Sequence, residues 1–316
     1  MEYIILIISL LAIVVGADRF VGASAAIARR LKISDFVIGA VVVGFGTSFP
    51  ELLVSLKGAV SGNSDVALGN VVGSNIFNVL GILGVTAMLF PIATSRENIR
   101  RDAPFCFGVS VLLLLIAFDF FTKGETLISR IDGVVLLAVF TFFMWMTLSK
   151  GGQDSSGEIE VQASSRKPLW YSITVAIVGL SVLILGCHFF VEQAVVIARN
   201  FGVSDAYISI TLIACGTSLP ELAASVAAAL KKNTQMALGN VIGSNIFNIT
   251  LILGASSLIR PLHSPDIVLT DYLVMTGAAL LLMIFATTKV RISRFEGLLL
   301  VLAFVAYNIW LLSMQG

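Results

Sequence analysis

Charged residues are scarce in this sequence. Asp, Glu, Lys and Arg make up only 12% of its 316 residues, about half of their usual share in a soluble domain, and 57% of the residues are hydrophobic. This composition excludes the soluble enzyme classes. The formal net charge of +1 gives no indication of a nucleic acid or an acidic partner.

Cysteine and histidine are also scarce, with three and two copies. Cys106, Cys187 and Cys215 lie in apolar segments at irregular spacing, which excludes a disulfide framework and a zinc motif. The sequence contains no nucleophile–base set and no paired aspartates. We therefore expect neither an enzyme nor a bound cofactor, and nothing indicates an obligate protein partner.

What the sequence does contain is a series of long apolar runs. A run of about 20 apolar residues is long enough to cross the lipid bilayer as a helix. The predicted helices are 3–28, 36–58, 66–89, 103–121, 132–148, 170–198, 204–229, 236–259, 267–288 and 297–314. The sequence thus predicts an all-α integral membrane protein with ten transmembrane helices. No basic stretch or cleavage site marks the first helix as a signal peptide, so we expect it to be retained.

The basic residues are distributed unevenly between the two sets of loops. One set holds fourteen: Arg29, Arg30, Lys32, Arg96, Arg100, Arg101, Lys150, Arg166, Lys167, Lys231, Lys232, Lys289, Arg291 and Arg294. The other set holds five: Lys57, Lys123, Arg130, Arg199 and Arg260. By the positive-inside rule, the first set faces the cytoplasm of a cell membrane and both termini lie outside. The polar linker 150–168 is then cytoplasmic and separates two five-helix units, 1–149 and 169–316.

The two units share an internal repeat. Residues 44–84 align without a gap to residues 214–254, at an offset of 170, with 23 of 41 positions identical. Because each unit has an odd number of spans, the second copy must cross the membrane upside down. Inverted repeats of this kind bring corresponding helices together at the bilayer midplane, where secondary transporters hold their substrate.

Each copy carries the motif Gly-Thr-Ser-x-Pro-Glu, which ends at Glu51 and at Glu221. An ionisable group at mid-membrane costs at least ~2.5 kcal/mol, so a pair of them needs compensation, and a bound cation supplies it. Helical spacing predicts that Thr47 and Ser48 share a face with Glu51, and Thr217 and Ser218 correspond to them. The proline before each glutamate frees backbone carbonyls in the preceding turn.

The next helix in each unit carries Gly-Ser-Asn-x-x-Asn. This motif places Ser74 and Asn78, and likewise Ser244 and Asn248, one turn apart on one face. The glycines four residues apart that precede these motifs predict a close approach of the helices. The candidate ligands are all oxygen atoms, a set that suits Ca2+ and Na+ rather than Zn2+ or copper. Elsewhere, we expect Asp18 and Arg19 to form a structural pair.

With these duplicated motifs the chain resembles the calcium/cation antiporter superfamily and, within it, the sodium/calcium exchangers. The resemblance implies a minimal prokaryotic member with ten helices and four clustered cation sites between helices 2, 3, 7 and 8. It implies that Ca2+ is held by Glu51 and Glu221 with the carbonyls of Thr47 and Thr217. For Na+ it implies those groups together with Ser48, Ser74, Asn78, Ser218, Ser244, Asn248 and the carbonyls of Gly44 and Ala214.

The expected function is therefore secondary active antiport of Na+ against Ca2+ by alternating access around midplane carboxylates, with both ions as substrates. A Ca2+/H+ or a K+-dependent antiporter is the alternative. Relatives of those kinds carry acids where this chain has Asn78 or Asn248, and this difference favours coupling to Na+. A cation channel, from another class, is a further alternative, because duplicated halves also build pores.

Overall fold

The fold is helical, with only four two-residue strands in the described part of the chain. The computed structural model describes residues 2–118, 127–150, 168–201, 214–288 and 290–314. The elements of the first half are α1 (Glu2–Leu31), α2 (Asp35–Ile38), η1 (Gly39–Val43), α3 (Gly44–Thr47), α4 (Phe49–Ser61), α5 (Ser64–Ile76), η2 (Phe77–Leu83), α6 (Gly84–Leu89), β1 (Ile92–Ala93), α7 (Arg96–Arg100), α8 (Asp102–Ala117), β2 (Leu127–Ile128) and α9 (Arg130–Lys150). Those of the second half are α10 (Leu169–Asn200), α12 (Ala214–Gly216), α13 (Leu219–Leu230), α14 (Thr234–Phe247), η4 (Asn248–Leu253), α15 (Gly254–Ile259), β3 (Leu262–His263), α16 (Leu269–Thr288), β4 (Arg291–Ile292) and α17 (Arg294–Met314).

Seven helices in the described residues are long and apolar enough to cross a membrane. An eighth is added if Asp35–Thr47 and Phe49–Ser61, which are bent by 47° relative to one another, form one span. The apolar runs placed most helix ends within a few residues, as for α1, predicted at 3–28 and observed at 2–31. Much of the predicted helix 204–229 and the linker 150–168 lies outside the described residues, so the count of ten stays a prediction.

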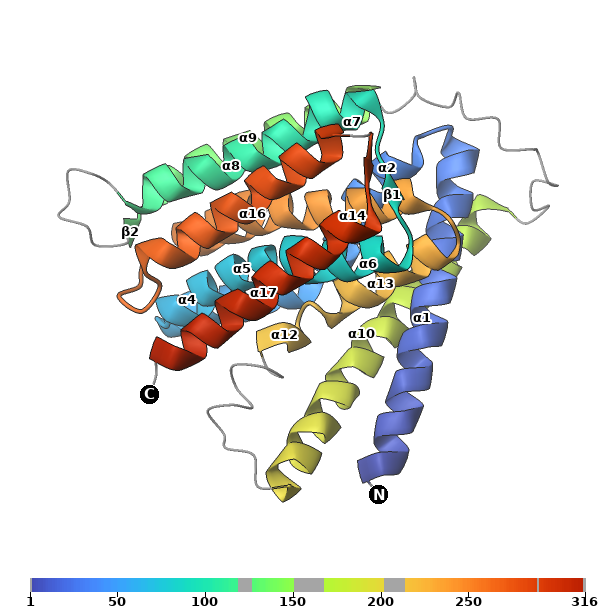
Figure 1. Cartoon of the computed structure of the whole chain (residues 1–316), viewed down its shortest axis with the longest axis horizontal. Coiled ribbons are helices and arrows are strands. Elements are labelled where there is room, and N and C mark those ends of the chain that lie inside the picture. Colours follow the sequence, from blue (N-terminus) through green and yellow to red (C-terminus); the bar gives the residue numbers. More distant parts are fainter. Residues whose placement is uncertain (1, 119–126, 151–167, 202–213, 289, 315–316) are drawn as a thin grey trace.

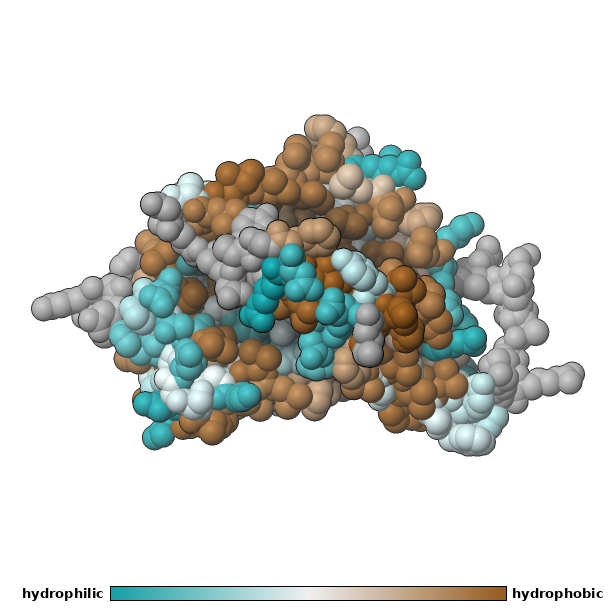
Figure 2. Space-filling view, turned by 90° about the horizontal axis from the view of Figure 1, so that it is seen from below, coloured by the Kyte–Doolittle hydropathy of each residue, from teal (hydrophilic) through white to brown (hydrophobic). Residues whose placement is uncertain are grey.

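Burial separates a central group of helices from an outer group. In the apolar windows of Ser64–Leu89 and Thr234–Ile259, 78% of the residues are buried. In α17 the share is 11%, because leucines such as Leu298 and Leu302 face outward. Figure 2 shows the hydropathy of one face of the molecule, where hydrophobic residues cover much of the surface and hydrophilic residues gather in patches. A largely apolar exterior around a packed centre is what a bilayer requires.

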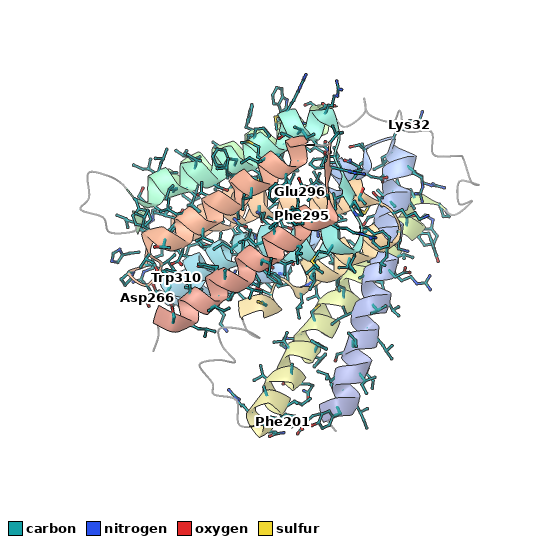
Figure 3. The ribbon with its side chains drawn as sticks, in the orientation of Figure 1. Lys32, Phe201, Asp266, Phe295, Glu296 and Trp310 are labelled. Carbon is teal, nitrogen blue, oxygen red and sulfur yellow. The ribbon has the colours of Figure 1, made fainter. Side chains whose placement is uncertain are left out.

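The helices α1 and α10 form a long antiparallel pair that diverges from the other helices (Figure 1). Figure 3 shows Lys32, after the end of α1, and Phe201, after the end of α10, at opposite ends of this pair. Glycines let the two backbones meet. A Cβ on Gly16 would lie 2.6 Å from the backbone nitrogen of Leu183, and one on Gly179 would lie 2.8 Å from that of Phe20. These contacts explain why small residues occur in two otherwise bulky apolar helices.

Glycines also join the two halves in the centre. A Cβ on Gly243 of α14 would lie 2.6 Å from the Cα of Ala40, so this helix packs tightly on η1, as the glycine spacing predicted. A Cβ on Gly297 would lie 2.7 Å from the carbonyl oxygen of Gly84, and one on Gly133 would lie 2.9 Å from that of Gly254. Each half therefore provides one partner in each of these two close contacts.

The short strands connect the halves at the helix ends, and the sequence did not predict them. In one pair β1 is antiparallel to β4, with Ile92 opposite Ile292. In the other pair β2 is antiparallel to β3, with Ile128 opposite Leu262. Two-residue strands have too few side chains to show an alternating pattern, which is why the sequence analysis missed them.

Candidate functional site

The helix is interrupted three residues before each glutamate. Ser48 has φ −79° and ψ 6°, and Ser218 has φ −91° and ψ 6°, so neither residue continues the preceding helix. A new helix, α4 or α13, begins at the next residue, with proline in its first turn. Glu51 and Glu221 therefore lie in the first turn of a helix, where the exposed N–H groups and the helix dipole favour negative charge.

Each glutamate is hydrogen-bonded to the serine of the opposite half. Ser48 donates to Oε1 of Glu221 at 2.9 Å, and Ser218 donates to Oε1 of Glu51 at 2.8 Å. The sequence predicted that Ser48 shares a helix face with Glu51, but its hydroxyl donates to the glutamate of the opposite half. The break at Ser48 takes the hydroxyl out of the i, i+3 relation that a continuous helix would give.

Asn78 and Asn248 lie where the next helices change their winding. Asn78 is in the π-helical segment η2 and Asn248 begins η4, so the helical ladder is locally widened at both residues. Single π turns inside α-helices occur frequently at functional sites. Both side chains are buried. The amide of Asn78 donates to Oδ1 of Asn245 at 3.0 Å, and that of Asn248 donates to Oδ1 of Asn75 at 3.1 Å.

Four buried oxygen atoms of the site have no hydrogen-bond partner among the described residues. They are Oε2 of Glu51, Oε2 of Glu221, Oδ1 of Asn78 and Oδ1 of Asn248. Both glutamates are at most 1% exposed, and no ion pair within the described ranges reaches either carboxylate. A buried acceptor without a donor costs free energy, and an unpaired carboxylate costs more. The site therefore offers carboxylate and amide oxygens, two from each half, to a group that carries positive charge.

The other predicted residues surround this centre. Oγ of Ser74 lies 3.0 Å from Oγ of Ser218, and Ser244 lies 3.4 Å from the carbonyl oxygen of Gly44. The Thr47 hydroxyl lies between two acceptors, 2.9 Å from the carbonyl oxygen of Val43 and 3.2 Å from Oδ1 of Asn240. Ala214 begins α12, directly after the undescribed residues 202–213.

Two asparagines that the sequence analysis did not select, Asn70 and Asn240, connect the halves. Nδ2 of Asn240 donates to the carbonyl oxygen of Glu221 at 3.2 Å and to Ser225 at 2.8 Å, and its Oδ1 accepts from Thr47 at 3.2 Å. Asn70 repeats this pattern with Glu51, Ser55 and Thr217. Each asparagine thus holds the glutamate helix of its own half and contacts the threonine of the other.

A signal for these residues was present in the sequence. Asn70, Asn75 and Ser55 are each identical to their counterparts at the offset of 170. The residues that are identical in both copies of the repeat therefore include those that support the site as well as the predicted ligands.

Outside the site, one expectation was wrong. Asp18 does not pair with the adjacent Arg19 but with Lys231, whose Nζ lies 2.6 Å from its Oδ1. Neighbouring residues on a helix point about 100° apart, whereas Lys231 follows α13, against which α1 packs. The described residues contain no group of three or more His, Cys, Asp and Glu side chains arranged for a metal ion. Any cation at the centre would therefore depend on the two glutamates together with neutral oxygens.

The fold and the site together define a multi-pass membrane protein with a buried, acceptor-rich centre made by both halves. A family model and individual relatives both match nearly the whole chain. The family model described as "Sodium/calcium exchanger protein" matches residues 1–149 and 171–313. The chain belongs to this family of sodium/calcium exchanger-like antiporters.

Individual relatives cover almost the whole chain. The CaxA protein of Alkalimonas amylolytica is 37% identical over 98% of both chains. The sodium/calcium exchanger MaX1 of Methanosarcina acetivorans is 34% identical over 97% of both chains. A solved structure of the sodium–calcium exchanger NCX_Mj, soaked with 2.5 mM Na+ and 0.1 mM Ca2+, has a TM-score of 0.82 and 34% identity over 96% of each chain. The names of these relatives describe an antiporter and two sodium/calcium exchangers.

Proposed function

We propose that the protein is a secondary antiporter that exchanges Na+ for Ca2+ across a cell membrane. The observation that carries the proposal is the set of four buried oxygens without donors, two from Glu51 and Glu221 and two from Asn78 and Asn248. Oxygen ligands suit both ions. Two carboxylates match the charge of one Ca2+, so the loaded site is neutral and can be closed within the membrane.

The mechanism that we propose is alternating access in a ten-helix, inverted-repeat architecture. The crossed bonds from Ser48 to Glu221 and from Ser218 to Glu51 support it, because each half contributes to the carboxylate of the other. Ions held between two such halves can be released to one side at a time. The proposed ligand set is the one that the resemblance implies, including Ser74, Ser244 and the backbone carbonyls.

Coupling to Na+ is proposed over coupling to H+ or K+ because of the two amides. An asparagine carries no proton that it can release near neutral pH. Asn78 and Asn248 therefore leave Glu51 and Glu221 as the acids of the proposed ligand set. The name of MaX1 as a sodium/calcium exchanger supports the same choice.

The test is Ca2+ uptake into proteoliposomes that contain only the purified protein. Vesicles loaded with Na+ and diluted into choline medium with 45Ca2+ should accumulate it, and vesicles loaded with choline should not. Vesicles with an outward H+ gradient or with K+ alone should remain at the choline level. Uptake driven by protons without Na+ would replace the proposal by the Ca2+/H+ alternative, and ion flux at channel rates without a counter-ion would exclude exchange.

The proposed orientation places both termini outside and the 150–168 linker in the cytoplasm. It is tested with one cysteine introduced into the linker after the three native cysteines have been replaced. The new thiol should react with a membrane-impermeant maleimide only after the cells are opened. Labelling of intact cells would reverse the orientation.

A further inference from the structure

Two buried asparagines, Asn75 and Asn245, lie beside the proposed ligands without belonging to them. They occupy corresponding positions of α5 and α14 and are 1% and 2% exposed. Each contacts the ligand of the opposite half, since Asn75 accepts from Asn248 and Asn245 accepts from Asn78. The function of these two residues follows from the direction in which each amide is held.

Backbone atoms fix that direction. Nδ2 of Asn75 faces the carbonyl oxygen of Asn245 at 3.4 Å and the sulfur of Met275 at 3.9 Å, and both of these atoms are acceptors. Nδ2 of Asn245 faces the carbonyl oxygen of Asn75, also at 3.4 Å. If either amide were turned over, its oxygen would stand against a carbonyl oxygen. The donor end of each amide therefore points to the backbone and its acceptor end points away.

The orientation of the Asn245 amide determines the orientation of the Asn78 amide that contacts it. Because Oδ1 of Asn245 is the atom that faces Asn78, the side chain of Asn78 must present Nδ2 to it. Oδ1 of Asn78 then points the other way, where it has no donor among the described residues. The same sequence of contacts runs from Asn75 to Asn248.

We infer that Asn75 and Asn245 are positioning residues that turn Asn248 and Asn78 so that oxygen, and not the amide N–H group, faces the bound ion. The two ends of a carboxamide have nearly the same size, so packing alone does not choose between them. An amide held the wrong way would remove a ligand and present positively polarised hydrogens to the cation. The inference rests on the proposed function, because it assumes that Asn78 and Asn248 bind the ion.

The experiment measures 45Ca2+ binding to purified protein, and its displacement by Na+, in a double-mutant cycle. Partners that orient a metal ligand are worth about 10-fold to 100-fold in affinity. Asn78→Ala and Asn245→Ala should each weaken Na+ binding by a factor in this range, measured as a rise in the Na+ concentration that displaces half of the bound 45Ca2+, because Asn78 belongs to the proposed Na+ ligands. The double variant should bind no more weakly than Asn78→Ala alone, because the second residue acts through the first.

The control is Asn98→Ala. Asn98 is also a buried asparagine, 5% exposed, and its amide donates to Gln235 at 2.6 Å outside the site. Its removal should leave the displacement of 45Ca2+ by Na+ unchanged even if it lowers thermal stability.

The outcomes separate the inference from the proposed function. If Asn78→Ala weakens Na+ binding and a folded Asn245→Ala does not, or if the two effects add, the positioning role is wrong while the ligand role stands. If Na+ displaces 45Ca2+ from Asn78→Ala at the normal concentration, the ligand role fails and the inference fails with it.

The inference can be tested even if one of the variants does not fold. If Asn245→Ala does not fold, the corresponding cycle with Asn75→Ala and Asn248→Ala is used. An ion-loaded structure of the unaltered protein is an independent measurement. The contacts of Asn78 with Asn245 and of Asn248 with Asn75 should persist in it, and their loss on ion binding would overturn the inference.

Discussion

The two halves of the chain correspond closely around the carboxylates and differ where the α1–α10 pair meets the other helices. At the centre, Ser48 donates a hydrogen bond of 2.9 Å to Glu221, and Ser218 donates one of 2.8 Å to Glu51. At the periphery, Asp18 pairs with Lys231, but the positions 170 residues away hold His188 and Ser61, which cannot form such a pair. The comparison indicates that a site shared by both halves requires matched residues, whereas the surrounding contacts are free to diverge.

The largest effect is expected when either glutamate loses its charge. This change tests whether both halves are equally required at the site. Glu51→Gln and Glu221→Gln should each abolish Na+-driven 45Ca2+ uptake in proteoliposomes while the protein still inserts in the membrane. With either substitution the loaded site keeps one uncompensated positive charge, and breaking a buried charge pair costs about 3–5 kcal/mol. Glu97→Gln is the matched control, because this glutamate pairs with Arg101 outside the site, and its uptake should be normal. Near-normal uptake by one of the two site variants would break the symmetry between the halves.

The second effect concerns the glycine contacts between the halves. Gly297→Ala should lower the thermal midpoint of the purified protein, because the new Cβ would lie within about 3 Å of three atoms, including the carbonyl oxygen of Gly84. Overpacking of this kind costs about 1–3 kcal/mol. Gly133→Ala should behave alike, since it meets Gly254 in the same way. Gly108→Ala is the control and should be neutral or slightly stabilising, because no described atom lies within 4 Å of its Cβ position.

How much of the fold the sequence predicted depends on the length of each element. Apolar runs located α10, and the continuous segment from α14 through η4 to α15, within a few residues, because a span of about 20 apolar residues is a strong signal. The break at Ser48 was only partly predicted, since Pro50 indicated freed carbonyls but not a new helix start. Two-residue strands and π turns arise from tertiary contacts and leave no periodic signal.

For the candidate site, the sequence predicted which residues would gather but not how they would pair. The structure brings the predicted residues into two hydrogen-bonded groups, one of Ser48 with Glu221 and one of Ser218 with Glu51 and Ser74. Helical periodicity predicts which residues share a face of one helix but not which helix that face contacts. The hydrogen bonds between the halves could therefore not be predicted. The supporting asparagines were marked by their identity in both copies, but their side chains have the same chemistry as those of Asn78 and Asn248, so residue type could not separate supporting residues from ligands.

The third effect compares two corresponding asparagines. Asn240→Ala should lower the thermal midpoint and Na+-driven uptake more than Asn70→Ala does. Both lose the same three contacts, but Asn240 is 1% exposed and Asn70 is half-buried, so water can replace more of the lost bonds at Asn70. A net loss of about 1 kcal/mol per hydrogen bond sets the scale. Equal effects would indicate that the two sides of the site are equally dry.

The smallest effect is expected at the ion pair that only one half possesses. Asp18 and Lys231 join α1 to the end of α13 beside an apolar crevice of about 550 Å³ that both side chains help to line. The two side chains are 54% and 37% exposed, so the pair is expected to contribute at most about 1 kcal/mol. Asp18→Asn and Lys231→Gln should therefore leave Ca2+ affinity unchanged and alter only the maximal rate of uptake, in the same direction and by similar factors.

The exchanged pair Asp18→Lys with Lys231→Asp should bring the rate back towards normal, because the attraction depends on opposite charge and not on which helix carries which sign. His188→Asn, at the position of α10 that corresponds to Asp18, should have no effect on the rate. If the single variants of the ion pair changed Ca2+ affinity instead of rate, the contact would belong to the ion site. The difference between the halves would then extend to the centre of the molecule.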